Sequence, residues 1–401
     1  MKYFVKSFGC RLNQYYADYF CNAVLKSGQE LASNSSNADV VAIASCIVTH
    51  RAERDTRRYI SQVRRLNPSA KIAVFGCYPM LRAMDGVFYA GNLKGLIKEL
   101  DLVDPGILDK PFMRIRVNIK IQEGCNFRCS YCVVPQVRGS SQSREMQDII
   151  REVENLWSNG VMEIVLTGIQ TGEWGREWGM RLSDLIYRLH DCFSGLRIRL
   201  SSISPIHITR EIVELMKSGV VLPHLHLPLQ HGSGRILKLM KRPYKLEYYV
   251  ELIEMLYTEV NNLAIGSDII VGYPEETEMD FEESFKLIES LPFAYLHIFE
   301  FSPRPGTQAS SLKPLPSFLV KRRKEKLLQL AREKKEAYLE SYIGKEVRGV
   351  VESHESGFFR ITTDNYMKLL IPENQYLQIG KVHRFYTLER MDLALLAKPL
   401  F

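Results

Sequence analysis

The chain has 401 residues, of which 46% are hydrophobic and 25% are charged, a composition typical of a globular protein with a substantial core and two or three domains. No apolar run is long enough to span a bilayer, and the amino end lacks the apolar core of a signal peptide, so we expect a cytoplasmic protein with no membrane partner. Lys and Arg outnumber Asp and Glu by 53 to 46, an excess that fits a polyanionic partner without establishing one.

Residues 1–105 alternate short apolar runs with amphipathic stretches, which predicts a βαβαβ domain with a parallel sheet. The predicted strands end at Cys10, Cys46 and Cys77. Because the carboxyl ends of parallel strands lie on one edge of a sheet, we expect these cysteines to meet there. In a reducing compartment, clustered cysteines are metal ligands or reactive thiols rather than disulfides. The alternative is three strand-end cysteines that merely pack.

A longer alternation of strands and helices occupies residues 111–335. Its strand-like runs are RVNIKIQEG, EIVLTGIQ, LRIRLSSI, HLHLPLQ, AIGSDIIVG and AYLHIFEFS. Six βα units predict an incomplete β/α barrel, whose active site would lie at the carboxyl ends of the strands.

The loop after the first of these strands carries Cys125, Cys129 and Cys132 in a Cys-x3-Cys-x2-Cys pattern. Three thiolates leave one iron of a [4Fe-4S] cluster without a protein ligand, so a small molecule can bind that iron. The alternatives are a zinc site or three free thiols. Zinc motifs usually pair Cys-x2-Cys with a second pair, and no His or Cys partner lies nearby in the sequence, which favours the cluster.

The carboxyl-terminal part begins with a long charged helix predicted over residues 316–342. Residues 336–401 contain short strand-like runs separated by turns, which predict a small β-barrel domain with antiparallel strands. Two basic runs lie in predicted helices, and each is either a nucleic-acid contact or, more commonly, a solvated helix face. The first run is Arg51, Arg54, Arg57, Arg58, Arg64 and Arg65, and the second is Lys321, Arg322, Arg323, Lys324, Lys326, Arg332, Lys334 and Lys335.

The two remaining cysteines, Cys21 and Cys192, lie in apolar helical patterns and are expected to be buried small hydrophobic residues. His224 and His226 alternate on one predicted strand and look like a metal pair. Histidines so placed in a barrel strand are more often hydrogen-bonded core residues, and we expect that role rather than a zinc site.

Several motifs in the chain carry a family resemblance. They are FGCRLNQ, ASCIVTHRAERDTR, FGCYPM, CSYCVVPQVRGSSQSRE, LTGIQTGEWG, HLHLPLQHGSGRILKLMKRPY, AIGSDIIVGYPEETEMDFEES and FSPRPGTQAS. The cysteine loop resembles that of the radical S-adenosylmethionine (SAM) superfamily, and nearly the whole chain resembles the methylthiotransferases within it. The terminal barrel resembles a TRAM domain, a small RNA-binding module.

This resemblance implies SAM and two [4Fe-4S] clusters, one on Cys125, Cys129 and Cys132 and an auxiliary one on Cys10, Cys46 and Cys77. SAM bound to the first cluster would yield a 5′-deoxyadenosyl radical, and the auxiliary cluster would carry the sulfur that joins carbon 2 of adenine as a methylthio group. The position of Tyr131 would lie beside the adenine of SAM. Arg144, Gln170 and Asp268 either face SAM as well or satisfy local backbone groups.

The substrate branch is suggested by residues 47–52 (IVTHRA) and by FGCRLNQY. Both resemble the branch acting on N6-threonylcarbamoyladenosine at position 37 of tRNA, 3′ of the anticodon. The alternatives are isopentenyladenosine in tRNA, a ribosomal protein aspartate, or an RNA-binding protein whose clusters are not catalytic. Expected partners are the tRNA anticodon stem-loop, an electron donor such as flavodoxin or ferredoxin, and a sulfur source. Candidate RNA contacts are the arginines after Cys46 and, in the terminal barrel, Phe358, Phe359, Arg360 and Lys368.

Overall fold

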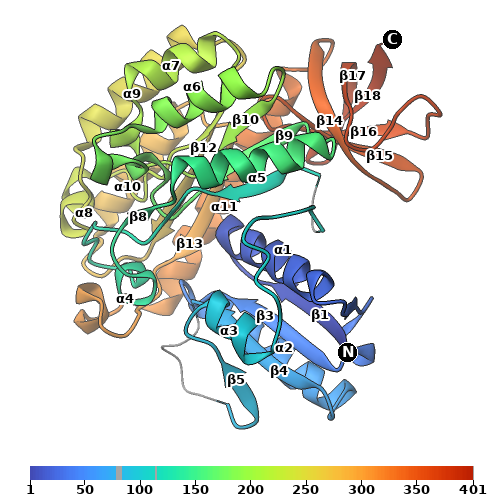
Figure 1. Cartoon of the computed structure of the whole chain (residues 1–401). Helices are drawn as coiled ribbons and strands as arrows, with labels where there is room; N and C mark the ends of the chain where they lie inside the picture. The colour runs from blue at the N-terminus through green and yellow to red at the C-terminus, as the bar shows by residue number, and fades with distance from the viewer. Residues whose placement is uncertain (78–83, 113–114, 401) are drawn as a thin grey trace.

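The computed structural model describes residues 1–77, 84–112 and 115–400, so the end of the FGCYPM motif lies outside the described residues. An α/β sheet domain, a β/α barrel and a small closed β-barrel follow one another along the chain (Figure 1). This arrangement confirms the predicted fold class. No helix in the described residues is long and apolar enough to cross a membrane.

The amino-terminal domain is built on a five-stranded parallel sheet in the order β2-β1-β3-β4-β5. Its strands are β1 (Lys2–Ser7), β2 (Glu30–Leu31), β3 (Val40–Ser45), β4 (Lys71–Gly76) and β5 (Val87–Tyr89). Every residue of β3 is buried, because alternate side chains pack on opposite faces of the sheet. Helices α1 (Arg11–Lys26) and α3 (Leu93–Glu99) cover one face, and α2 (His50–Leu66) covers the other.

The central barrel has six parallel strands in two three-stranded halves. The strands are β6 (Val117–Lys120), β9 (Glu163–Thr167), β10 (Arg197–Leu200), β11 (His224–His226), β12 (Ala264–Val271) and β13 (Tyr295–Glu300). Single bridges between Ile198 and Val221 and between Ser202 and His226 join the halves. Within the described residues no ladder joins β6 to β13, and α1 packs against β6. The barrel is therefore incomplete, as predicted.

Helices surround the barrel and connect its strands. They are α4 (Val134–Arg138), α5 (Met146–Ser158), α6 (Leu182–Cys192), α7 (Arg210–Lys217), α8 (Gly234–Leu239), α9 (Leu246–Glu259), α10 (Glu278–Ser290) and α11 (Ser317–Glu340). Cys21 is buried in α1, as predicted, but the same prediction for Cys192 is wrong. Cys192 is the last residue of α6 and is exposed there, because the apolar face of that helix is supplied by Leu182, Leu185, Ile186 and Leu189.

The terminal barrel closes in the order β14-β15-β16-β18-β17. Its strands are β14 (Glu346–Glu355), β15 (Phe358–Thr363), β16 (Lys368–Pro372), β17 (Val382–Met391) and β18 (Ala394–Leu400). The prediction of antiparallel strands is wrong for one pair, since β16 and β18 run parallel. A ring of five strands cannot alternate direction at every neighbour, so closure requires at least one parallel pair.

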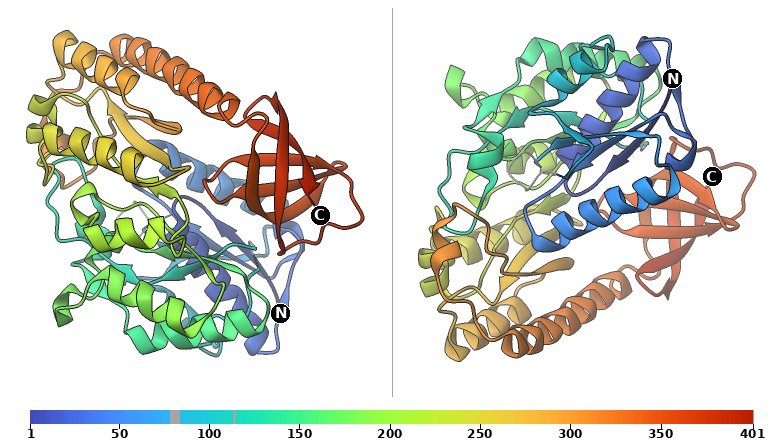
Figure 2. Two further views of the ribbon diagram at one scale, coloured as in Figure 1. Left: turned by 90° about the horizontal axis from the view of Figure 1, so that it is seen from above. Right: turned by 90° about the horizontal axis from the view of Figure 1, so that it is seen from below.

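Helix α11 connects the two barrels, and Figure 2 shows it running to the edge of the terminal one. Leu327 and Leu330 of this helix pack in the main core, whereas Leu339 packs in the core of the terminal barrel. At the interface the buried carboxylate of Glu163 accepts hydrogen bonds from Arg197 and Arg199, at 2.9–3.0 Å. Arg199 also donates to the carbonyl of Thr363 at 3.1 Å, so charged side chains at the amino ends of the barrel strands hold the terminal barrel.

Candidate functional site

The loop that carries Cys125, Cys129 and Cys132 starts with a backbone turn that only glycine fits. Gly124 has φ +74°, and a Cβ atom there would lie 1.9 Å from the carbonyl oxygen of Ser140. The short antiparallel strands β7 (Gln122–Glu123) and β8 (Gln142–Ser143) close the base of the loop. The loop therefore leaves the carboxyl end of β6 in a fixed direction.

The three thiols of this loop influence one another electrostatically. Burial raises the pKa of Cys132 to about 12 and that of Cys125 above its usual value, and Cys129 adds to both effects. An Arg242 N–H donates to the Cys129 sulfur at 3.4 Å. Thiols that resist ionisation in a buried pocket become stable thiolates when a metal neutralises them, so this loop fits an iron-sulfur cluster.

The second set of cysteines follows three adjacent strands of the amino-terminal sheet, β1, β3 and β4. Burial, then the neighbouring Cys77 and Cys10, raise the pKa of Cys46 to about 12, which places the three thiols together. A Cβ atom on Gly9 would lie 2.8 Å from the Cys46 sulfur, and φ is +87° at Gly9. The turn after β1 therefore approaches the Cys46 side chain closely, and it depends on glycine.

Asn13 and Arg138 organise this second set. The Asn13 amide donates to the carbonyls of Phe8 and Ser45, at 2.8 and 2.7 Å, and so joins the turns after β1 and β3. Arg138 ends α4, the helix that follows the loop of Cys125, Cys129 and Cys132, and its Nε donates to the Cys77 sulfur at 3.1 Å. Its two Nη atoms donate to Asn13 and Glu123, at 2.7 and 2.8 Å. One buried guanidinium therefore links Cys77 and Asn13 of the amino-terminal domain to Glu123, two residues before Cys125.

The segment after β13 also joins the two sets. Ser302 Oγ accepts from the backbone N–H of His50 at 2.9 Å, and Arg304 donates to Glu53 at 2.6 Å. Both partners lie at the start of α2, shortly after Cys46. The carbonyl of Ser130, in the loop of Cys125, Cys129 and Cys132, accepts from the N–H of Ala309 at 2.8 Å. The FSPRPGTQAS segment thus ties the IVTHRA segment to the loop.

Two of the predicted SAM-contacting residues lie in or beside the loop of Cys125, Cys129 and Cys132. Tyr131 is within the loop, and its hydroxyl is 3.5 Å from Arg242. Gln170 follows β9, its N–H donates to Gln122 at 2.8 Å, and its side chain lies near Cys125, where it partly offsets the rise that burial causes in the pKa of that thiol. Both residues are therefore placed to contact a molecule bound at this loop.

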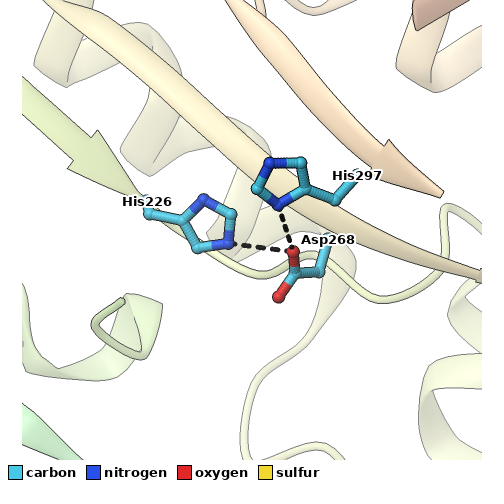
Figure 3. Close-up of side chains that lie close together, drawn as sticks. All are labelled: His226, Asp268 and His297. Carbon is cyan, nitrogen blue, oxygen red and sulfur yellow. Dashed lines mark hydrogen bonds and ion pairs between the residues drawn. The ribbon is translucent and has the colours of Figure 1, made fainter. Parts of the chain in front are cut away.

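The other two predicted SAM-contacting residues have protein partners. Arg144 pairs with the buried Glu152 at 3.0 Å and donates to Tyr15 of α1 at 3.3 Å, so its guanidinium joins the barrel to the amino-terminal domain. Asp268 lies on β12, where one carboxylate oxygen is 3.0 Å from His226 and 3.2 Å from His297 (Figure 3).

The barrel histidines are hydrogen-bonded, as predicted. His224 and His226 are buried, and each has a ring nitrogen near the hydroxyl of Tyr295, at 2.9 and 3.2 Å. The sequence analysis did not single out His297, although the AYLHIFEFS run that forms β13 also has ring side chains at alternate positions. It also missed Arg138 and Arg242, whose roles depend on contacts distant in sequence.

The candidate RNA contacts differ in exposure. Phe359 packs in the core of the terminal barrel, so it does not offer its ring to RNA, whereas Arg360 is exposed. In the first basic run Arg54, Arg58 and Arg65 are exposed on α2. In the second run Arg323 is buried and paired with Glu276, and exposed members such as Arg322, Lys326 and Arg332 also pair with acidic residues.

Comparisons with known proteins agree with this site. Residues 119–288 match the Radical SAM superfamily, and residues 2–87 match a family described as Uncharacterized protein family UPF0004. A radical S-adenosylmethionine methyltransferase, TsrM from Kitasatospora setae, has a similar structure with a TM-score of 0.53. The two share 12% sequence identity over 77% of this chain and 75% of TsrM, so the likeness concerns the fold.

Curated relatives match nearly the whole chain. The threonylcarbamoyladenosine tRNA methylthiotransferase MtaB of Aquifex aeolicus is 34% identical, with 96% of this chain and 99% of that protein covered. The tRNA-2-methylthio-N(6)-dimethylallyladenosine synthase of Thermosipho africanus is 33% identical, with 95% of each protein covered. The chain therefore belongs to the radical SAM methylthiotransferase family, whose enzymes use SAM and a [4Fe-4S] cluster.

Proposed function

We propose that this enzyme converts N6-threonylcarbamoyladenosine at position 37 of tRNA, 3′ of the anticodon, to its 2-methylthio derivative. The observation that carries the proposal is the pair of three-cysteine sets, with Arg138 bonded to Cys77 of one set and to Glu123 at the base of the loop that carries the other. The name of the Aquifex relative and the IVTHRA segment support this substrate. Isopentenyladenosine is the alternative, since the Thermosipho relative is named for the dimethylallyl nucleoside.

We propose a second, auxiliary [4Fe-4S] cluster on Cys10, Cys46 and Cys77. Two buried thiols of raised pKa next to a buried guanidinium support it, because such thiols are suited to hold a metal. When bound, the first cluster with SAM supplies a carbon radical that can break an unreactive C–H bond, and the auxiliary cluster supplies sulfur. Tyr131, Gln170, Arg144 and Asp268 are proposed SAM contacts, with Gln170 supported by its place near Cys125.

Each part of the chain has a proposed role in this reaction, and the partners follow from those roles. Residues 1–105 would bind the auxiliary cluster, residues 111–335 would carry out the radical chemistry, and residues 336–401 would form a TRAM-like RNA-binding domain. The anticodon stem-loop would contact exposed arginines such as Arg54 and Arg58 of α2 and Arg360 of the terminal barrel, because cations bind phosphates. A flavodoxin or ferredoxin would supply electrons, a separate donor would supply sulfur, and the cytoplasm is the proposed location.

The test is a nucleoside analysis. Reconstituted enzyme, SAM and a reductant are incubated with anticodon stem-loops that carry threonylcarbamoyladenosine or isopentenyladenosine, and the digested RNA is examined by mass spectrometry. The proposal predicts a 2-methylthio product from the threonylcarbamoyl RNA. A product from the isopentenyl RNA alone, or from a ribosomal protein alone, would contradict it.

A further inference from the structure

Three side chains on neighbouring strands of the barrel lie in mutual contact (Figure 3). They are His226 on β11, Asp268 on β12 and His297 on β13, with donor atoms all within 4.8 Å of one another. The same carboxylate oxygen of Asp268 is 3.0 Å from His226 Nε2 and 3.2 Å from His297 Nδ1. Burial opposes ionisation of Asp268, but the two imidazoles outweigh it and lower the pKa of this carboxyl.

The donors and acceptors of this group can be assigned from its contacts. An ionised Asp268 only accepts hydrogen bonds, so His226 Nε2 and His297 Nδ1 both donate to it. The other nitrogen of a neutral His226 then accepts from Tyr295, whose hydroxyl oxygen in turn accepts from His224 Nε2. The protons that His226, Tyr295 and His224 donate are therefore all used in hydrogen bonds within the protein.

His297 differs from the other two histidines because its outer nitrogen has no such partner. Its side chain is 55% exposed, whereas His224 and His226 are buried. Within the described parts of the chain no hydrogen bond reaches Nε2 of His297. The arrangement is that of an imidazole held through its Nδ1–H by a carboxylate, which leaves Nε2 as a hydrogen-bond acceptor.

An aromatic ring lies beside this open nitrogen. Phe299 is two residues further along β13, on the same side of the strand as Tyr295 and His297, and 39% of it is exposed. The rings of His297 and Phe299 lie edge to face, with centroids 6.4 Å apart. An exposed ring next to a polar tip can contact the face of a nucleobase and a polar group attached to it.

We propose that His297 and Phe299 recognise the N6 substituent of the substrate adenosine, with His297 Nε2 accepting a hydrogen bond from the hydroxyl or a urea N–H of the threonylcarbamoyl group. The inference rests on the proposed function. A threonylcarbamoyl group has a carboxylate, a hydroxyl and a urea that can form hydrogen bonds with polar side chains such as His297. A dimethylallyl group has no polar atom. A site built to hydrogen-bond a polar group rejects the analogue that lacks it.

The same donor set also suits a divalent metal ion, since two imidazoles and a carboxylate are common ligands. The contacts favour substrate recognition, because both imidazole protons already satisfy Asp268. Metal occupancy is therefore an outcome that the test must exclude.

The test is equilibrium binding of reconstituted enzyme to three anticodon stem-loops that differ only at position 37. They carry threonylcarbamoyladenosine, unmodified adenosine or isopentenyladenosine. The variants are His297→Phe, which keeps a ring and removes the nitrogen acceptor, and His297→Gln, which keeps a side-chain oxygen as an acceptor. His190→Phe, at an exposed position of α6, is the matched control. Circular dichroism checks the fold, and His297→Gln carries the test alone if His297→Phe does not fold.

Wild type and His190→Phe should bind the threonylcarbamoyl RNA about tenfold more tightly than the unmodified RNA, the worth of one hydrogen bond. His297→Phe should lose about tenfold for the threonylcarbamoyl RNA only, and His297→Gln should lose less. The inference is overturned if His297→Phe keeps the wild-type preference, if it weakens all three RNAs equally, or if one equivalent of a non-iron metal disappears in Asp268→Asn. If the wild-type enzyme makes no product from the threonylcarbamoyl RNA, the proposed function is wrong. If it makes that product, the binding results test only the inference about His297.

Discussion

Replacing Arg138 with Gln tests the contacts that its guanidinium makes beside the auxiliary cysteine set. The guanidinium is 5% exposed and donates to the Cys77 sulfur at 3.1 Å, to Glu123 at 2.8 Å and to Asn13 at 2.7 Å. Breaking a fully buried ion pair costs about 3–5 kcal/mol. Glu123 is 27% exposed and keeps Lys120 at 3.3 Å, so we expect a loss of about 2 kcal/mol in the free energy of unfolding.

The same substitution should change the reduction potential of the proposed auxiliary cluster. A hydrogen bond from a charged donor is worth about 2 kcal/mol. We assume that half of this stabilisation, about 1 kcal/mol, is present only in the reduced, more negative state of the cluster. For one electron this corresponds to about 40 mV. Because the lost N–H donor favours the reduced state, the potential of Arg138→Gln should fall by that amount.

The assay is a redox titration followed by electron paramagnetic resonance. Replacing Cys125, Cys129 and Cys132 with Ala removes the radical SAM cluster and isolates the auxiliary signal. Arg242→Gln is the matched control, since Arg242 donates to Cys129 at 3.4 Å and should shift the radical SAM cluster instead. An unchanged auxiliary potential in Arg138→Gln, or a shift confined to the other cluster, would refute the reasoning.

Three further predictions concern local structure. Gly9→Ala should abolish iron binding by Cys10, Cys46 and Cys77, because the new Cβ would lie 2.8 Å from the Cys46 sulfur. Iron analysis is the measurement. Gly28→Ala is the control and should load iron normally, since φ is also positive there but nothing lies within 4 Å. Glu163→Gln removes the carboxylate that pairs with Arg197 and Arg199 and should lower the free energy of unfolding by about 3 kcal/mol in a denaturant titration; an unchanged midpoint contradicts this. Burial raises the pKa of Tyr366, but nearby cations led by Arg11 outweigh it and lower the pKa to about 8. The folded protein then releases this proton before the unfolded chain does at about pH 10, so stability should rise between these pH values, and ultraviolet titration should show a tyrosine ionising near pH 8 that is missing in Tyr366→Phe.

The cysteine geometry could be predicted from sequence because it follows from a general rule. Strands β1, β3 and β4 are parallel neighbours, so residues at their carboxyl ends meet whatever the helices between them contain. The Cys125 loop is local, and its spacing alone brings three thiols into one short segment. Both sets therefore depend on features that a sequence displays directly.

Other features depend on contacts that periodicity does not encode. Cys192 lies in an apolar pattern, yet at the end of α6 the helix no longer faces the core. The parallel pairing of β16 with β18 follows from closing five strands, and the strand count at closure is a tertiary property. Arg138 looks like any basic residue in its motif, and only the fold brings it to Cys77.

The most direct test of the central claim is the iron content of anaerobically reconstituted protein. Two three-cysteine sets that each hold a [4Fe-4S] cluster predict about eight irons per chain, and Cys46→Ala should contain about four. Four irons in the wild type, or an unchanged count in Cys46→Ala, would contradict the two-cluster account.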